Sequence, residues 1–242
     1  TVQYMTSILN LQQELSKNNI NFCIDFISNE SLIPRARNKA LSNFMKTNFT
    51  HFLFIDADIQ FEPSALIENL KFNKDVVCCP YAKKGLNWNR FIYSMQNDKN
   101  SHESPLSRCL DYTYNAFIDQ NTNKIIKKDN FIKVKHASTG FMLIKKDILT
   151  KMHEKYKDIL KIKTDDCSFH DEYLCGLFCC EIKNEQYLSE DYAFCERVYE
   201  TKGEVWVNVK QNLNHIGIFS FESDIKNRKN LVRSENERIF YS

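Results

Sequence analysis

The sequence predicts an α/β fold in which a mixed, mostly parallel sheet is flanked by helices. Segments with the apolar pattern of strands alternate with segments that carry apolar side chains on one helical face. Residues 51–55, HFLFI, form a run typical of strands buried inside a parallel sheet. No internal repeat and no Gly-, Ser- or Pro-rich linker divides the chain, so we expect a single domain over residues 1–242.

Helices are expected where apolar residues recur at intervals of three and four positions. Pro34 suits the first turn of one helix, and Glu62, Pro63 and Ser64 begin another. Gly203 is expected to cap the last helix at its C-terminus. The expected helices are residues 2–16, 34–46, 62–71, 147–156 and 189–201.

Strands are expected in the short apolar or alternating segments between these helices. They are residues 22–27, 51–55, 75–79, 131–134, 141–144 and 204–209. Residues 80–89 are expected to form a loop, and the polar residues 97–130 a variable insertion. Ligands of α/β sheets bind beyond the carboxyl ends of strands, so the residues directly after position 55 are the first candidates for a site.

The composition indicates a folded globular protein with no dominant charge. The chain is 43% hydrophobic and contains 18 Phe and 11 Tyr, unlike a disordered protein. Its 33 basic and 31 acidic residues leave a formal net charge of +2, so nucleic acid is not an expected partner. We expect no transmembrane segment, because no apolar run is long enough to span a bilayer, and we find no signal peptide at the start.

The cysteines favour a reducing compartment. There are nine, an odd number that excludes complete pairing within one chain, and most lie in apolar runs where a thiol packs as a small hydrophobic group. We therefore expect a cytoplasmic protein. The glycosylation sequons at Asn29 and Asn48 leave a secretory lumen as the alternative if a segment precedes Thr1.

Asp56 and Asp58 directly follow the apolar run 51–55. The end of a strand and a solvated turn would account for both residues. An Asp-x-Asp turn also lets two carboxylates reach one divalent cation, directly or through water, and that ion then contacts phosphate oxygens. The cation would relieve the repulsion between the carboxylates, so Asp56 and Asp58 are candidate metal ligands.

Two arginines lie in the first helical turn after Pro34. Cationic side chains are unfavourable at a helix N-terminus unless an anion lies nearby, and the guanidinium fork matches the geometry of phosphate. Arg35 and Arg37 are therefore candidates for binding a diphosphate. The alternative is a solvated helix start paired with Glu30 or Asp25.

Five segments, in order, resemble nucleotide-sugar glycosyltransferases with the GT-A fold, which is related to the Rossmann fold. The Asp-x-Asp segment FLFIDADIQFEP is preceded by LIPRARNKAL at residues 32–41. It is followed by ASTGFMLIKKDIL at 137–149, YLSEDYAFCERV at 187–198 and NHIG at 214–217. The resemblance spans about residues 31–217 and implies a metal-dependent glycosyltransferase, in particular a hexosyltransferase. The first strand of that fold would lie upstream of Thr1.

The resemblance also implies a ligand set. Mn²⁺ or Mg²⁺ would be bound by Asp56, Asp58 and His215. The donor would be a nucleoside-diphosphate sugar, in particular a UDP-sugar. The residues expected to contact it are Arg35, Arg37, Asn38, Asp56, Lys84 and Gly140.

Ser189, Glu190 and Asp191 begin a predicted helix. A serine N-cap and acidic residues in the first turn stabilise a helix, which alone could account for all three. The resemblance adds that Asp191, or else Glu190, acts as the base that deprotonates an acceptor hydroxyl. The transfer would then invert the anomeric carbon, and the acceptor would be a glycan or a protein.

The roles expected for His215, Lys84 and Gly140 depend on the presence of the metal and the donor. Imidazole is an acceptable ligand for Mn²⁺, and His136 and His170 compete with His215 for this role. In the expected loop 80–89, Lys84 could contact the diphosphate, although a solvated loop is the default. Gly140 is expected to allow close approach of its backbone to the donor sugar or to a neighbouring strand.

Two other functions stay open. A catalytically silent domain of GT-A-like fold would serve as an accessory module that binds a partner through residues 97–130. A nucleotidyltransferase would also use an acidic metal site, but the sequence contains no Gly-rich phosphate-binding loop.

Overall fold

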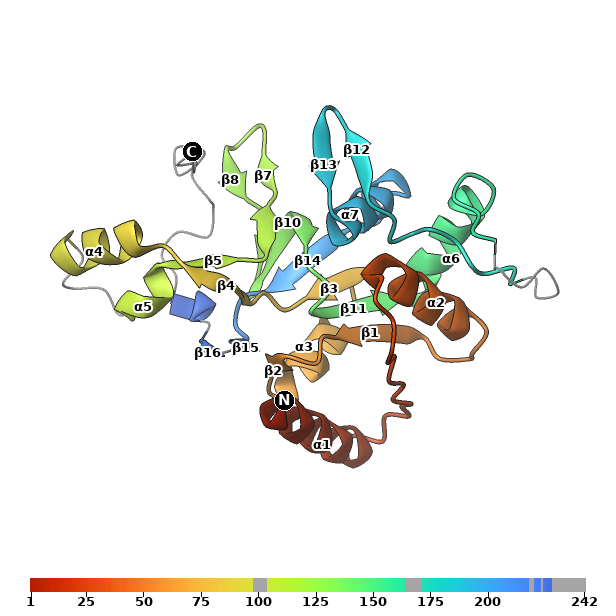
Figure 1. Ribbon diagram of the computed structural model, residues 1–242, viewed down its shortest axis with the longest axis horizontal. Coiled ribbons are helices and arrows are strands. Elements are labelled where there is room, and N and C mark those ends of the chain that lie inside the picture. Colours follow the sequence, from red (N-terminus) through yellow and green to blue (C-terminus); the bar gives the residue numbers. More distant parts are fainter. Residues whose placement is uncertain (98–103, 164–170, 218–219, 223, 228–242) are drawn as a thin grey trace.

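A seven-stranded sheet forms the centre of the protein in the computed structural model (Figure 1). The structure describes residues 1–97, 104–163, 171–217, 220–222 and 224–227. The strands follow the order β1-β11-β3-β14-β10-β6, and β9 also pairs with β10. They are β1 (His51–Ile55), β3 (Val76–Cys78), β6 (Tyr114–Ala116), β9 (Lys127–Lys128), β10 (Phe131–Ala137), β11 (Phe141–Lys145) and β14 (Val205–Asn208).

The expected α/β class is confirmed, but the expectation of a mostly parallel sheet is wrong. Among the described strand pairs of the central sheet only β3 and β14 are parallel, and the others are antiparallel. β1 lies at the end of the strand order, and its residues are half-buried rather than fully enclosed. An apolar run indicates burial by helices but carries no information about strand direction, which explains the error.

Helices cover both faces of this sheet, as Figure 1 shows. On one face α2, α6 and α7 contribute to a large hydrophobic core, and on the other α1 and α3 contribute to a second core. The alternation along β11 joins the two cores, because Met142 and Ile144 point into the first and Phe141 and Leu143 into the second. The helices are α1 (Val2–Lys17), α2 (Ile33–Met45), α3 (Ser64–Phe72), α4 (Trp88–Asn97), α5 (Pro105–Arg108), α6 (Lys146–Tyr156) and α7 (Glu190–Glu200), with a 3₁₀ turn, η1, at Ile225–Asn227.

Small sheets surround this layered centre. One three-stranded sheet has the order β16-β15-β2, and its strand β2 comes directly after the Asp-x-Asp turn. Three further pairs are antiparallel. These strands are β2 (Ile59–Gln60), β15 (Asn214–Ile216) and β16 (Ser220–Phe221), β4 (Ala82–Leu86) with β5 (Leu110–Tyr112), β7 (Ile118–Asp119) with β8 (Lys124–Ile125), and β12 (Glu181–Lys183) with β13 (Gln186–Leu188).

Two segments differ from the expected secondary structure. Residues 22–27 form no strand and pair with none of the described strands. Phe22, Phe26 and Ile27 in this segment are exposed. Residues 80–89, expected to be a loop, contain β4 and the start of α4. The described part of 97–130 contains α5 and β5 to β9, so this insertion is built of short paired elements.

The end of α7 also differs in detail. The residue with a left-handed backbone is Lys202, with φ of 63°, and not Gly203. Gly203 is instead needed for close packing. A Cβ atom at this position would lie 2.7 Å from Cδ1 of Ile148 and 2.8 Å from Cγ1 of Val198.

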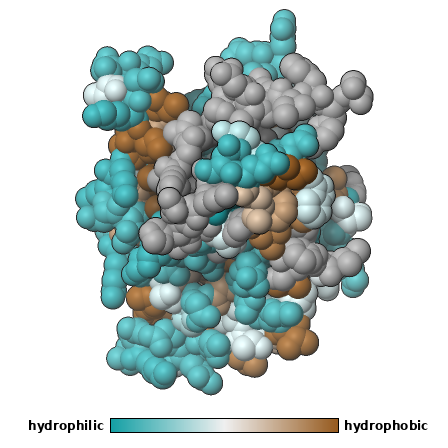
Figure 2. Space-filling model, turned by 90° about the vertical axis from the view of Figure 1, so that its left-hand side faces the viewer, coloured by the Kyte–Doolittle hydropathy of each residue, from teal (hydrophilic) through white to brown (hydrophobic). Residues whose placement is uncertain are grey.

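The surface on the side of α4 combines hydrophilic residues with separate apolar patches (Figure 2). The exposed apolar side chains of α4 are Trp88, Ile92, Tyr93 and Met95. Within the described ranges, no helix has the length and hydropathy needed to cross a membrane.

Candidate functional site

Asp56 and Asp58 lie in a turn between β1 and β2. The backbone N–H of Asp56 donates to the carbonyl of Gly140 (3.0 Å), which keeps the turn beside the start of β11. The N–H of Ile59 donates to the carbonyl of Asp56 (3.0 Å) and closes the turn. The predicted location of the carboxylate pair at the end of a strand is therefore confirmed.

The pairing of β2 with β15 brings His215 to Asp58. His215 lies opposite Ile59, and the N–H of Ile216 donates to the carbonyl of Asp58 (2.8 Å). As a result, Nε2 of His215 lies 3.3 Å from Oδ2 of Asp58. Nδ1 of the same ring donates to the carbonyl of Ala82 (2.9 Å), which orients the ring with Nε2 toward the carboxylate.

Lys84 contacts the same oxygen of Asp58. Its Nζ lies 2.5 Å from Oδ2 and donates a hydrogen bond to it. The hydrogen bond with His215, followed by the one from Lys84, holds the pKa of Asp58 well below its usual range, against the opposing effect of burial. Asp58 is therefore an anion stabilised by two cationic or proton-donating partners.

Arg37 connects Asp56 with Glu190. Its Nη2 lies 3.6 Å from Oδ1 of Asp56, and its Nε lies 3.6 Å from Oε1 of Glu190. The guanidinium also lies 5.3 Å from the ring centroid of Phe54 and 6.0 Å from that of Phe178. Arg37 is only 9% exposed, and its Nε has no hydrogen-bond partner within the described residues. A buried guanidinium with an unused donor is suited to an anionic ligand.

The two carboxylates that face Arg37 are held in a partly desolvated environment. Burial raises the pKa of Asp56, and the charges of Asp58 and Asp191 add to this effect, while Arg37 opposes it. Burial also raises the pKa of Glu190, with a further contribution from Asp191. These couplings show that the two acidic pairs belong to one electrostatic cluster.

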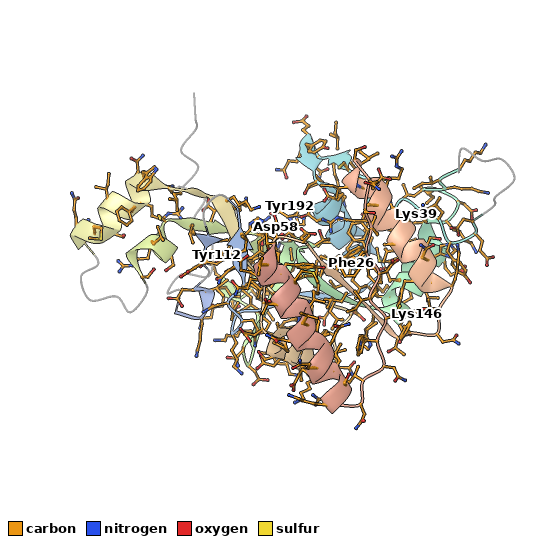
Figure 3. The ribbon with its side chains drawn as sticks, turned by 60° about the horizontal axis from the view of Figure 1, so that its bottom comes forward. Phe26, Lys39, Asp58, Tyr112, Lys146 and Tyr192 are labelled. Carbon is orange, nitrogen blue, oxygen red and sulfur yellow. The ribbon has the colours of Figure 1, made fainter. Side chains whose placement is uncertain are left out.

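The start of α7 carries Glu190 and Asp191 into this cluster. Figure 3 labels Asp58 and Tyr192 near the middle of the molecule, where the turn after β1 approaches the first turn of α7. Ser189 is the N-cap residue, but its hydroxyl donates to Oδ1 of Asp191 instead of capping the helix backbone. The N–H of Tyr192 also donates to Oδ1 (2.9 Å), so the orientation of the Asp191 carboxylate is fixed.

Gly140 allows close approach to Tyr81. A Cβ atom at position 140 would lie 2.4 Å from Cε1 and from the hydroxyl oxygen of Tyr81. The Tyr81 ring also packs edge-on against His215, with 4.9 Å between ring centroids. The neighbour that requires Gly140 is thus an aromatic side chain that supports the predicted metal ligand, and not another strand.

Two of the expected donor-binding residues lie in other contacts. Arg35 is exposed and pairs with Glu30 (2.7 Å), which is one of the alternatives open in the sequence. The buried Asn38 accepts a hydrogen bond from the N–H of Phe178 (2.8 Å) and anchors α2 to the segment before α7. The structure brings Arg37 to the carboxylates, whereas Arg35 pairs with Glu30 and Asn38 bonds to Phe178.

The competing histidines lie elsewhere or outside the described residues. His136 is buried between Asn115 (3.2 Å) and Glu196 (3.0 Å) and stacks on Tyr192. His170 lies outside the described residues. Among the described histidines, His215 contacts the carboxylate pair directly.

The possible metal-ligand atoms at this site fit a hard divalent cation only in part. One carboxylate and one imidazole, Asp58 and His215, face each other, and the second nitrogen of the ring is held by a carbonyl as in many metal sites. The third expected ligand, Asp56, is turned toward Arg37. In the part of the chain that the structure describes, no group of three or more His, Cys, Asp or Glu side chains is arranged to hold a metal ion.

Two supporting groups were not predicted from the sequence. The Ala82 carbonyl, which orients His215, has no sequence signal, because every residue carries a carbonyl. The sequence indicated Tyr81 only indirectly. Gly140 was expected to allow a close approach, but which group approaches Gly140 depends on tertiary packing.

Comparisons with known proteins place few limits on the function. No protein-family model matches the chain, and no curated protein matches it. Among solved structures it is similar to the crystal structure of A197 from STIV, at 17% sequence identity and a TM-score of 0.44, over 89% of this chain and 87% of that one.

Proposed function

We propose that this protein is a metal-dependent glycosyltransferase of GT-A-like fold. It would transfer a sugar, in particular a hexose, from a nucleoside-diphosphate sugar to an acceptor hydroxyl. The observation that supports this function is the meeting of four separate segments of the chain. The turn after β1, the start of α2, the start of α7 and strand β15 bring together Asp56, Asp58, Arg37, Glu190, Asp191 and His215.

Arg37 is proposed to bind the diphosphate of the donor. Its Nε has no hydrogen-bond partner in the described structure, and both its ion pairs are 3.6 Å long. Phosphate oxygens placed beside it would complete the hydrogen bonding of the guanidinium. UDP is the proposed nucleotide of the donor.

Asp58 and His215 are proposed to hold Mn²⁺ or Mg²⁺, and Asp56 would join them by rotating away from Arg37. When bound, the cation stabilises the negative charge of the departing diphosphate. The N–H of Asp56 fixes the turn to Gly140, and the Ala82 carbonyl orients His215, so the chain positions both ligand-bearing segments in advance.

Asp191 is proposed to act as the base. The acceptor oxygen forms a bond to the anomeric carbon while the bond from that carbon to the phosphate oxygen breaks. The electron pair leaves with the diphosphate, and the hydroxyl proton passes to the Asp191 carboxylate. Because Oδ1 of Asp191 is held by Ser189 and Tyr192, Oδ2 is the proposed proton acceptor. Attack opposite the leaving group inverts the anomeric centre.

The acceptor is proposed to be a glycan or a protein, and the proposed compartment is the cytoplasm. The cysteines in the described ranges are free thiols, as a reducing compartment would keep them.

Titration with UDP, in the presence and absence of Mn²⁺, tests the proposed site. The wild-type protein should bind UDP more tightly with Mn²⁺, and Arg37→Ala should weaken this binding by at least about tenfold. Lys39→Ala is the matched control, because it removes a positive charge from an exposed position of the same helix. Circular dichroism verifies that the Arg37 variant is folded.

Turnover distinguishes an enzyme from a silent domain. Release of sugar from a UDP-sugar that depends on Mn²⁺ and is abolished in Asp58→Ala would support the transferase. Tight UDP binding without any turnover across the common UDP-sugars and acceptors would favour the accessory domain. If the protein binds neither UDP nor Mn²⁺, the proposed function is contradicted.

A further inference from the structure

We propose that Lys84 is an internal counter-cation that takes the place of the divalent ion at Asp58 and exchanges with it when the donor binds. This inference rests on the proposed function, because it concerns the same metal site. Before the metal binds, the ammonium group of Lys84 offsets the charge of the Asp58 carboxylate.

Lys84 and His215 both contact the same oxygen atom, Oδ2 of Asp58. Oδ2 of Asp58 lies 2.5 Å from Nζ of Lys84 and 3.3 Å from Nε2 of His215. A divalent ion held by Asp58 and His215 would use this oxygen as a ligand. Lys84 and such an ion would therefore compete for the same negatively charged atom.

Electrostatics disfavours occupation of this oxygen by both cations at once. An ammonium group has no lone pair to offer a metal and repels a dication nearby. Binding of the ion would therefore favour departure of Lys84 from Asp58. Without a metal, by contrast, the ammonium group offsets the charge of Asp58 next to the partly desolvated Asp56.

The local structure of β4 allows this movement. Lys83, Lys84 and Gly85 are exposed, and the pairing of β4 with β5 is irregular between Ala82 and Leu86. A Cβ atom at Gly85 would meet nothing within 4 Å, so the space beside Lys84 is open.

The orientation of His215 does not depend on the Lys84 side chain. The group that fixes the imidazole is the backbone carbonyl of Ala82, two residues earlier in β4. Lys84 can therefore move away from Asp58 while the histidine stays aligned. After release, the natural partner of its ammonium group is the diphosphate that arrives with the metal.

A titration with Mn²⁺ alone tests the exchange. Isothermal titration calorimetry, or the loss of the free Mn²⁺ signal in electron paramagnetic resonance, gives the affinity without nucleotide. We expect Lys84→Met to bind Mn²⁺ roughly fivefold more tightly than the wild type, because a competing ion pair is removed. Lys83→Met is the matched control, with the same change in charge on the neighbouring exposed position, and should change the affinity by less than about twofold.

The second arm uses UDP at saturating Mn²⁺. There Lys84→Met should weaken UDP binding about threefold or more, because the released ammonium group no longer contacts the diphosphate. One substitution would then have opposite effects on the two ligands. Equal Mn²⁺ affinity in the wild type and Lys84→Met would overturn the exchange while leaving the metal site intact. No Mn²⁺ binding in either protein would instead contradict the proposed metal site, and the exchange with it.

Discussion

Asp58 and His215 lie 3.3 Å apart because the strand that follows Asp58 pairs with the strand that carries His215. The contact joins distant positions of the chain through a two-residue strand, β2, and the carbonyl of Asp58 itself accepts a hydrogen bond from β15. The Asp-x-Asp turn thus supplies a carboxylate and also the backbone that positions the imidazole. This dual role explains why the carboxylates lie in a turn that leads into another strand.

Removing the imidazole should weaken metal binding without unfolding the protein. His215→Ala is expected to lower the affinity for Mn²⁺ by at least about tenfold, because Asp58 loses the partner that would complete the coordination with it. Calorimetric titration with Mn²⁺ measures the effect. His51→Ala is the control, since His51 lies at the opposite end of β1. Equal affinities in the wild type and His215→Ala would exclude His215 as a ligand.

Substitutions of Asp191 and Glu190 should affect different kinetic parameters. Asp191→Asn is expected to lower kcat by about two orders of magnitude or more with little change in donor affinity, the usual scale for a general base. Glu190→Gln should act mainly on donor binding, because Glu190 faces the guanidinium of Arg37. Steady-state transfer and direct UDP binding, measured for both variants, distinguish the two roles. Unchanged transfer in Asp191→Asn would move the base to another residue.

Gly140 offers a steric test of the support for His215. In Gly140→Ala the new methyl group would overlap the Tyr81 ring, so we expect the free energy of unfolding to fall by about 1–3 kcal/mol. Gly85→Ala is the control, because a methyl group at that position would meet nothing within 4 Å. Urea denaturation measures both variants.

A double-mutant cycle identifies the cause of that loss. Adding Tyr81→Ala to Gly140→Ala removes the overlapping ring, so the two changes should cost less together than the sum of the single changes. Simple additivity would mean that Gly140 acts through something other than Tyr81.

The main helices and strands could be predicted from the sequence because each carries its own periodicity. Residues 34–46 and 189–201 are examples, where α2 and α7 form within one or two residues of the expected ends. Strand direction and pairing could not be predicted, because they depend on contacts between distant segments. Residues 22–27 show the same limit, since a strand-like sequence forms no strand without a partner edge.

The site was predictable where a residue type and its position agree. Asp56 and Asp58 directly follow β1, and Arg37 lies near the N-terminus of α2, so the sequence position of these residues already indicated a ligand site. The partner of each side chain was not predictable. Arg35 has the same chemistry as Arg37 two residues away, but its helical position directs it to Glu30. Lys84 meets Asp58 through an irregular strand pair, and no local pattern in residues 80–89 indicates that pairing.

Glu204 should make the stability of the fold sensitive to acid. Burial tends to raise its pKa, but hydrogen bonds from Lys133 (2.7 Å) and Lys74 (3.0 Å) outweigh burial and lower the pKa from 4.5 to about 2. A carboxyl group with a depressed pKa in the folded state stabilises the fold fully above its unfolded pKa. The contribution is lost as the pH falls from about 4.5 through about 2.

Glu204→Gln should therefore lower the free energy of unfolding by about 1 kcal/mol at pH 7, because two lysines lose their anionic partner at a partly solvent-screened site. The difference from the wild type should shrink as the pH is lowered from about 5 toward about 3, where the wild-type carboxylate begins to lose its advantage. Urea denaturation at several pH values measures it, with the exposed Glu62→Gln as the control. A difference that stays constant across this range would show that Glu204 stabilises the fold by packing or neutral hydrogen bonds rather than by its charge.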